Sequence, residues 1–214
     1  MFGGSGDDII KAYGGSDIID GGEGNDTITA GADLITAGNG MNTVHGGGGI
    51  DLITGGGDND DLHGDGGDDT IMGGYGDDDI HGGDGNDIID GGEHDDILHG
   101  DDGDDLIQGG LNTMGTSMLD VIHGGAGDDT IFGGTYDESS GTPVKLANTD
   151  VTKEIWIDGG SGNDEIWGQD MAVKQSIWGG TGWDDIHGGN MVTNQYLYGL
   201  DDDDTIHPGQ SAVT

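Results

Sequence analysis

Aspartate recurs along this chain at a fixed distance from glycine, in a unit of nine residues that reads Gly-Gly-x-Gly-x-Asp-x-aliphatic-x. Two copies lie back to back at residues 73–90, and Asp78 and Asp87 hold the same position in each. Glycines at this spacing permit tight turns with positive φ and let the backbone approach another backbone or an ion closely. Carboxylates beside such turns point to cation binding.

The residues after each aspartate must form the element that holds the turn in place. In one copy, Asp79 and His81 point to one side and Ile80 points to the other, which is the alternation of a β-strand. Each copy therefore predicts a loop followed by a short strand with one aliphatic side chain facing inward.

An aliphatic residue holds this inward position in every copy. The twenty predicted inward residues are Ile10, Ile19, Ile28, Ile35, Val44, Ile53, Leu62, Ile71, Ile80, Ile89, Leu98, Ile107, Ile122, Ile131, Ile157, Ile166, Ile177, Ile186, Leu197 and Ile206. Up to Ile107 the spacing is nine residues except between Ile28 and Ile35, where we expect a shortened loop without a full metal site. After Ile107, steps of nine residues alternate with longer steps.

This alternation has a simple geometric meaning. If two copies form one turn of a coil, odd copies lie on one side and even copies on the other, so every insertion falls on the same edge. The longest insertion, at residues 135–154, is expected to be a surface loop.

The composition excludes several classes of partner. The chain has 214 residues, 51 of them glycine, and only 30% are hydrophobic, so a conventional globular core is not expected. Four Lys and Arg stand against 44 Asp and Glu, a formal net charge of −40 that disfavours nucleic acid and anionic membranes and favours cations. There is no cysteine for thiolate metal sites. No apolar run is long enough for a transmembrane segment.

The complete Gly-Gly-x-Gly-x-Asp motif carries a family resemblance because it recurs so often. It is present at residues 3–8, 21–26, 46–51, 73–78, 82–87, 124–129, 159–164 and 179–184. In this respect the sequence resembles the RTX family of calcium-binding nonapeptide repeats, over nearly the whole chain. The resemblance implies an all-β fold, a parallel β-roll (β-solenoid) of roughly ten two-repeat turns with Ca²⁺ in the turn loops. We expect a single β-roll over 1–214, with regular repeats at 1–108, repeats with insertions on one edge at 109–207, and a tail at 208–214.

The resemblance also implies a set of metal ligands. In the family, the aspartate of each loop and nearby loop carbonyls bind Ca²⁺ between loops that stack two copies apart. The implied ligands here are Asp8, Asp26, Asp51, Asp60, Asp69, Asp78, Asp87, Asp96, Asp105, Asp129, Asp164, Asp184 and Asp204. They correspond to about a dozen Ca²⁺ ions, and oxygen ligands suit Ca²⁺ better than Zn²⁺. Asp58 and His94 replace a glycine of the motif, Asn42 replaces an aspartate, and Gln175 and Gln195 occupy the aspartate position after insertions.

Calcium is expected to be part of folding. A chain with so little apolar surface and so much charge is predicted to be disordered without metal. Burial of the aliphatic series offsets only part of the conformational entropy lost on ordering the chain. We therefore expect folding and calcium binding to be one event.

Two outward rows accompany the inward series. Histidines follow the inward aliphatic on five successive odd copies, with neighbours about 4.8 Å apart: His45, His63, His81, His99 and His123. A solvated ladder, a packing surface, and a transition-metal or pH-sensing role are the alternatives, and protonation below about pH 6 would place like charges side by side. The even copies carry Ile18, Leu34, Leu52, Thr70, Ile88 and Leu106, either as a contact surface or as residues that merely suit a strand.

Aromatic residues gather near the insertions. We expect Trp156, Trp178, Tyr196 and Tyr198 on the odd side and Trp167 and Trp183 in the even copies. Both a protein interface and stacking on carbohydrate stay open for them.

No GxSxG, HExxH, P-loop or EF-hand pattern is present, so the chain is not expected to be an enzyme. The sequence favours an extracellular, secreted structural protein that folds on Ca²⁺ and self-associates, as a filament or surface layer, through its solenoid ends or outward faces. The repeats begin at Gly3 with no polar cap before them, which leaves strand edges open. The alternative is a calcium-triggered folding, secretion or carbohydrate-binding module of a larger RTX-like protein.

Overall fold

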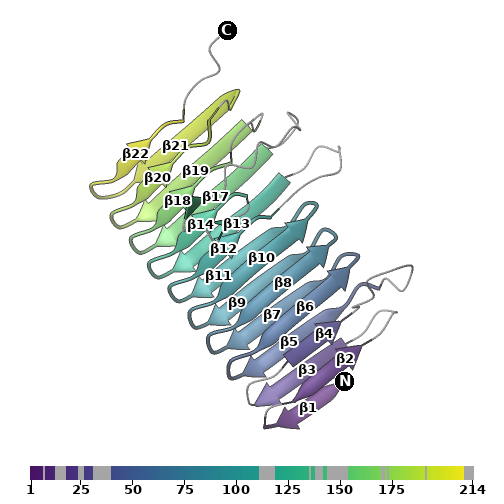
Figure 1. The fold of residues 1–214 in the computed structure, drawn as a ribbon. Coiled ribbons are helices and arrows are strands. Elements are labelled where there is room, and N and C mark those ends of the chain that lie inside the picture. Colours follow the sequence, from purple (N-terminus) through teal and green to yellow (C-terminus); the bar gives the residue numbers. More distant parts are fainter. Residues whose placement is uncertain are drawn as a thin grey trace.

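The chain winds into a β-roll of two parallel sheets. The computed structural model describes residues 1–6, 8–12, 18–23, 27–30, 40–110, 119–134, 136–137, 142–143, 154–169, 172, 174–190 and 192–209. Within them, two ten-stranded sheets receive alternate strands of the chain, so two strands make one turn (Figure 1). Every strand pair in these two sheets is parallel, and the predicted all-β parallel solenoid is confirmed.

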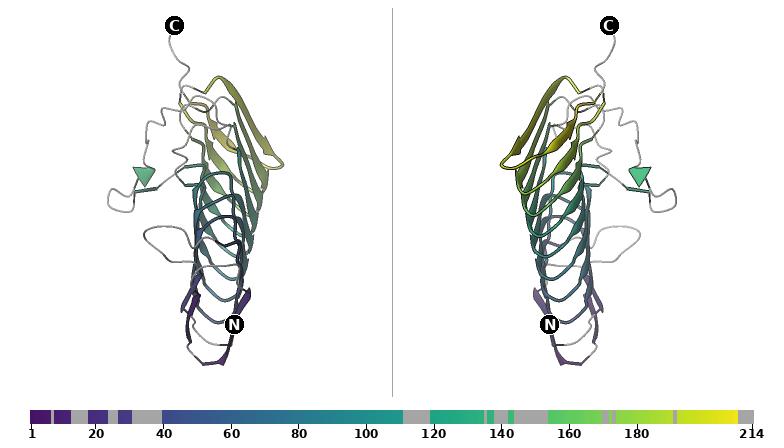
Figure 2. Two further views of the ribbon diagram at one scale, coloured as in Figure 1. Left: turned by 90° about the vertical axis from the view of Figure 1, so that its right-hand side faces the viewer. Right: turned by 90° about the vertical axis from the view of Figure 1, so that its left-hand side faces the viewer.

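We call the two sheets A and B. Sheet A contains, in spatial order, β1 (Phe2–Ser5), β3 (Ile18–Glu23), β5 (Thr43–Gly48), β7 (Asp61–Gly66), β9 (Asp79–Asp84), β11 (Ile97–Asp102), β13 (Leu119–Ala126), β17 (Glu154–Ser161), β19 (Lys174–Thr181) and β21 (Asn194–Leu200). Sheet B contains β2 (Ile9–Ala12), β4 (Thr27–Ala30), β6 (Leu52–Gly57), β8 (Thr70–Tyr75), β10 (Ile88–Glu93), β12 (Leu106–Gln108), β14 (Thr130–Phe132), β18 (Glu165–Trp167), β20 (Asp185–His187) and β22 (Thr205–His207). The sheets face each other across a thin core (Figure 2).

The aliphatic position of each repeat forms that core. In sheet A, Ile80 pairs with Leu98, and in sheet B, Ile71 pairs with Ile89, so side chains at equivalent repeat positions stack from turn to turn. The core residues from Val44 to Ile186 are at most 2% exposed. At the C-terminal end Leu197 is partly buried and Ile206 is 39% exposed, because the stack ends there.

The first three repeats, those of Ile10, Ile19 and Ile28, lie on the opposite sheets from those that the sequence predicted. The count of alternate copies placed Ile10 and Ile28 on the same side as Val44, but both belong to sheet B while Val44 belongs to sheet A. We expected Ile35 to occupy a rung of its own, between Ile28 and Val44. Instead β4 pairs directly with β6, and β3 pairs directly with β5, so Ile19 stacks on Val44 and Ile28 aligns with Ile53. No additional strand fits between these hydrogen-bonded neighbours; Ile35 itself lies outside the described residues.

The same correction changes the predicted outward row on the even copies. Ile18 belongs to sheet A, where it pairs with Thr43, and Leu34 lies outside the described residues. The row on sheet B begins instead at Ile9 and runs through Thr27 to Leu52. It continues through Thr70, Ile88, Leu106 and Thr130.

The prediction that the insertions after residue 108 share one edge is confirmed. The connections from β12 to β13, β14 to β17, β18 to β19 and β20 to β21 each pass from sheet B to sheet A. The connection from β4 to β5, where the sequence predicted a shortened loop, is also long and lies on the same edge. We name this the B-to-A edge and the regular edge the A-to-B edge. The 135–154 insertion is more than a loop, since β15 (Tyr136–Asp137) and β16 (Thr142–Pro143) form a small antiparallel pair outside the two large sheets (Figure 2). In the part of the chain that the structure describes, no helix is long and apolar enough to cross a membrane.

Candidate metal centres in the turns

The turn loops depend on residues with positive φ. At the end of β8 and in the turn that follows it, Gly74 and Gly76 have φ of 110° and 133°, a region that disfavours side chains. Asp58 and His94, which replace the second of these glycines in their own loops, keep positive φ values of 68° and 95°. These two departures from the motif therefore preserve the shape of the loop.

Aspartates form a continuous ladder along the A-to-B edge. The backbone N–H of Asp51 donates a 2.7 Å hydrogen bond to Oδ1 of Asp69, one turn further on. The N–H of Asp69 does the same to Asp87, also at 2.7 Å. The pattern extends through Asp105, Asp129, Asp164 and Asp184 to Asp204. Each carboxylate thus connects one turn to the turn before it.

The B-to-A edge carries a shorter ladder. Asn42 donates from its backbone and its side chain to Oδ1 of Asp60, each at 2.8 Å, and the ladder continues through Asp78 and Asp96 to Asp120. Beyond Asp120 the ladder position no longer holds an aspartate. It holds Ile155, then Gln175 and Gln195, whose amides hydrogen-bond to each other at 3.1 Å. The carboxylate series on this edge therefore ends where the longest insertion begins.

Asp120 was missed by the sequence reasoning. It lies after an insertion and outside any glycine motif, yet it is 2% exposed and accepts a 3.3 Å hydrogen bond from the N–H of Asp96. One signal could have found it. Asp120 lies two residues before the inward Ile122, as Asp78 lies two residues before Ile80.

The second oxygen of these carboxylates is buried and unsatisfied. Oδ2 forms no hydrogen bond in Asp60, Asp69, Asp78, Asp87, Asp96, Asp105, Asp129, Asp164 and Asp184. These residues are at most 3% exposed. A buried polar atom without a partner is costly, and a buried charge more so, unless a cation compensates it.

Backbone carbonyls converge on the same oxygens. A Cβ atom on Gly55 would lie 2.6 Å from Oδ2 of Asp60 and 2.7 Å from the carbonyl oxygen of Gly73, one turn further on. On the other edge, Gly46 has the same relation to Oδ2 of Asp51 and the carbonyl oxygen of Gly64, at 2.6 and 2.7 Å. The glycine leaves a space where carboxylate and carbonyl oxygens meet.

The electrostatics of the turns reflect this burial. Burial raises the pKa of Asp96 to about 9 and that of Asp129 to about 8, against an ordinary value of 3.8. Burial likewise raises the pKa of Asp78 to about 7 and of Asp60 to about 6, with neighbouring aspartates adding to the effect and backbone hydrogen bonds opposing it. Without a cation, the ionised ladder is therefore strongly disfavoured.

The donor set fits Ca²⁺. It consists of carboxylate and carbonyl oxygens in the turn loops, which is the ligand set that calcium prefers, and it includes neither sulfur nor nitrogen ligands. Of the thirteen predicted ligands, ten lie buried in the ladders, Asp8 and Asp204 lie half-buried in the end turns, and Asp26 lies outside the described residues. A bound calcium would neutralise the carboxylates that the fold has taken out of water.

Stacked turns with buried carboxylates on both edges define a calcium-binding parallel β-roll. The family model of the RTX calcium-binding nonapeptide repeat (4 copies) matches residues 2–35, 36–71, 72–107, 114–135, 156–170 and 176–190, more than half of the chain. The chain belongs to this family of calcium-binding repeat proteins. A search among curated proteins found no match.

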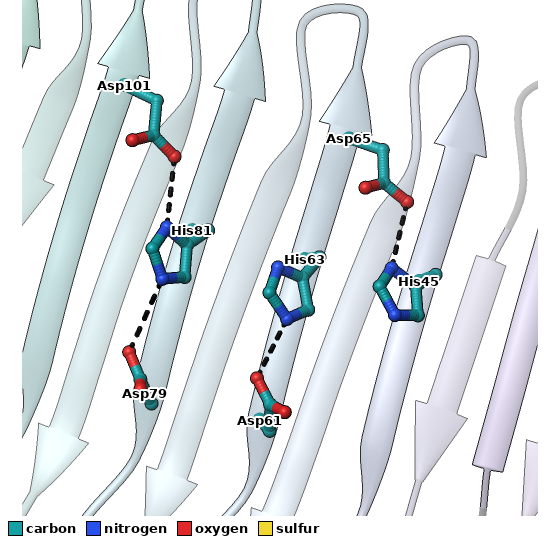
Figure 3. Close-up of polar contacts among 7 residues, drawn as sticks. All are labelled: His45, Asp61, His63, Asp65, Asp79, His81 and Asp101. Atoms are coloured by element: carbon teal, nitrogen blue, oxygen red, sulfur yellow. Dashed lines mark hydrogen bonds and ion pairs between the residues drawn. The ribbon is translucent and has the colours of Figure 1, made fainter.

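The five predicted histidines form a stacked ladder on the outer face of sheet A. Their rings stack at centroid distances of 4.6, 5.1, 4.4 and 4.8 Å, as the strand spacing predicts. Carboxylates flank them: Nδ1 of His45 lies 3.1 Å from Asp65, and Nε2 of His63 lies 2.8 Å from Asp61 (Figure 3). Burial lowers the pKa of His99, and its histidine neighbours add to this effect.

Aromatic residues extend the row of rings on sheet A. Trp156 meets His123 edge-on at 4.8 Å, Trp178 lies 5.1 Å from Trp156, and Tyr198 stacks on Trp178 at 5.6 Å. These aromatic residues lie on the predicted side of the roll. Their rings make a continuous surface from the histidines to β21.

Proposed function

We propose that this protein is an extracellular structural β-roll that folds when about a dozen Ca²⁺ ions enter its turns and then self-associates, without catalytic activity. The observation that carries the calcium-dependent part is the row of buried, unpartnered Oδ2 atoms, of which Asp78 and Asp96 are examples. Secretion is supported by the repeat type, which is typical of secreted proteins. An extracellular medium also supplies calcium at the millimolar level that extracellular modules use.

Removal of calcium tests the folding step. The metal-free chain has to bury many like charges, so its β circular-dichroism signal should disappear on addition of EDTA and return with excess Ca²⁺. Excess Mg²⁺ is the control, because it demands near-octahedral geometry and dehydrates reluctantly. A β signal that persists in EDTA at neutral pH would exclude coupled folding.

Self-association is supported by what the ends of the roll expose. Phe2 and Ile9 in the first strands are 82% and 75% exposed, and Leu200 in β21 is 63% exposed. Among the described strands, β1, β2, β21 and β22 each lie at the edge of a sheet, where backbone groups are available to another strand. End-to-end addition would continue both sheets and pair these edge strands.

Electron microscopy of the calcium-loaded protein tests this part of the proposal. Filaments are expected for the parent protein and should be lost in Ile206→Lys, which places a charge in the terminal β22. Met72→Lys is a control for the added charge, since Met72 is 40% exposed against 39% for Ile206 but lies on the outer face of the mid-sheet strand β8. Monodisperse monomers of the parent at high concentration would exclude self-association, and filaments that only Met72→Lys abolishes would indicate lateral packing.

A carbohydrate-binding module is a second candidate, favoured by the aromatic row. Trp156, Trp178 and Tyr198 present neighbouring rings on one face, and rings of this kind can stack on sugars. Co-sedimentation with insoluble polysaccharides, compared between the parent and Trp178→Ala, tests this alternative. Equal recovery of both proteins in the supernatant would argue against it.

A further inference from the structure

We propose that Asp185, His187 and His207, on the outer face of sheet B, bind a borderline transition metal such as Zn²⁺ or Co²⁺. This site is separate from the calcium turns and uses different chemistry. Its ligands are two imidazoles and one carboxylate, a set that suits Zn²⁺. Calcium prefers oxygen ligands alone and is not expected to compete for it.

The fold places the three side chains together. Strands β20 and β22 are parallel neighbours, with His187 directly opposite His207. Asp185 lies two residues before His187 on the same strand, so both side chains point to the same face of the sheet. This arrangement follows from the pairing of strands that are separated by an insertion and a turn.

The distances match a metal site. Oδ1 of Asp185 lies 3.1 Å from Nε2 of His187 and 3.3 Å from Nε2 of His207, and one ligand atom from each residue lies within 4.8 Å of the others. Ligand atoms around a tetrahedral Zn²⁺, at bond lengths of about 2.0–2.1 Å, are separated by roughly 3.3 Å. The two imidazole nitrogens thus already lie at nearly the right separation from the carboxylate oxygen.

The central oxygen has no other partner. Oδ1 of Asp185 is shielded from solvent and forms no hydrogen bond, so neither imidazole contact has hydrogen-bond geometry. A metal ion bound to Oδ1 would give this buried oxygen the partner that it lacks. The rings of His187 and His207 stack at 4.5 Å with an interplanar angle of 14°, so one ring has to turn for both Nε2 atoms to bind the same ion. His207 remains half-exposed, with 53% of its side chain accessible, so an ion can reach the site.

The histidine ladder on sheet A offers a less convergent arrangement. Asp79, His81 and His99 also come within reach of one ion. However, Nε2 of His81 lies 3.6 Å from Asp79 while its Nδ1 lies 3.1 Å from Asp101, so the two nitrogens face different carboxylates (Figure 3). The cluster on sheet B, where one oxygen faces two imidazoles, is therefore the stronger candidate.

Trp167 supplies a reporter for this site. Its ring stacks on His187 at 3.7 Å with an interplanar angle of 3°, and its Nε1 donates to Glu165 at 3.0 Å. This stacking holds the His187 ring in position. A paramagnetic ion bound to His187 would quench the fluorescence of the adjacent indole.

The test is titration of the full chain, loaded with Ca²⁺, with Co²⁺. One equivalent should produce visible d–d absorption and quench tryptophan emission, and Zn²⁺ should displace it. His207→Gln and Asp185→Asn should each weaken Co²⁺ binding by at least about tenfold, while the calcium-dependent circular-dichroism signal stays intact. Trp167→Phe should keep the absorption and lose most of the quenching.

The matched control is His99→Gln, the same change in the ladder on the other sheet. It should leave the site intact, with unchanged Co²⁺ affinity. Loss of the absorption in His99→Gln but not in His207→Gln would place the ion on the ladder and overturn the proposal. Equal binding by the parent protein and both ligand-position variants, or no saturable Co²⁺ binding, would overturn it too.

Discussion

The backbone N–H of Asp60 donates a 2.8 Å hydrogen bond to Oδ1 of Asp78, while Oδ2 of Asp78 is buried with no hydrogen bond. The Asp78 carboxylate therefore has two functions. One oxygen holds successive turns together through the backbone, and the other is left for an ion. A single side chain links the stacking of the roll to its metal binding, which explains why the same residue recurs at the same position.

Substitution of a ladder aspartate should separate these functions. Asp78→Asn keeps an oxygen that can accept the hydrogen bond from Asp60 but removes a charged ligand, so the calcium concentration at the folding midpoint should rise roughly tenfold. Circular dichroism during a calcium titration measures this shift. Asp84→Asn, an exposed change of equal charge in the following turn, is the control and should shift the midpoint little. Coincident curves for the two variants would contradict the assignment of Asp78 as a ligand.

A methyl group placed in the space where the Asp60 carboxylate and the Gly73 carbonyl oxygen meet should obstruct ion binding there. Gly55→Ala would bring Cβ within 2.6 Å of Oδ2 of Asp60 and 2.7 Å of the Gly73 carbonyl, so we expect a loss of about 1–3 kcal/mol in calcium-dependent stability. Gly66→Ala is the matched control because its nearest heavy atom, the Gly47 carbonyl oxygen, would lie 3.8 Å away. Urea unfolding in excess Ca²⁺ compares them. If the two substitutions lower the free energy of unfolding equally, steric obstruction of the space beside Asp60 is not the cause of the loss.

The metal-free roll should be most stable in mild acid. Burial raises the pKa of Asp78 to about 7 and of Asp96 to about 9 from an ordinary 3.8, so between about pH 4 and these values the folded state binds more protons than the unfolded state. The free energy of unfolding of the calcium-free protein should therefore fall as pH rises through this window. Circular dichroism of calcium-stripped protein from pH 4 to 9 measures the effect.

Histidines act in the opposite direction in this pH series. Burial lowers the pKa of His99 and of His123, so both oppose folding once the pH falls below their ordinary 6.5. His99→Gln removes one of these contributions and should extend the stable range further into acid. A β signal that increases steadily with pH in the absence of calcium would contradict the dominance of the aspartates.

Truncation of the core should test the inward series independently of metal. Leu98→Ala removes a side chain that is 0% exposed between the two sheets and should destabilise the calcium-loaded roll by about 2–5 kcal/mol. Ile97→Ala, next to it on β11 but 42% exposed on the outer face, should cost less than about 1 kcal/mol. Thermal unfolding in excess Ca²⁺ provides the comparison, and equal losses would contradict the assignment of Leu98 to the inward face.

Much of the fold was predictable because the repeat is a local signal. Within each copy, glycines with positive φ, a carboxylate and one aliphatic residue lie at invariant spacing, so the loop, the strand and the inward face follow from a few adjacent residues. The same rule placed the insertions on one edge, since a nine-residue step always returns the chain to the opposite sheet. Asp120 was not predicted as a ladder residue because no glycine motif precedes it, although it lies two residues before the inward Ile122, as the other ladder aspartates do before their inward residues.

The period, the turn chemistry and the alternation of sheets can be read from the sequence, because these features depend on backbone conformations within a single repeat. Which strands become neighbours depends on how the whole roll stacks. Ile28 aligns with Ile53, and Ile19 aligns with Val44. These pairs form because each strand hydrogen-bonds to the strand of the next turn on the same sheet, and the length of the connection between the two strands does not change this pairing. For the same reason only the folded roll brings His207 beside Asp185 and His187, because their convergence depends on the register between two strands.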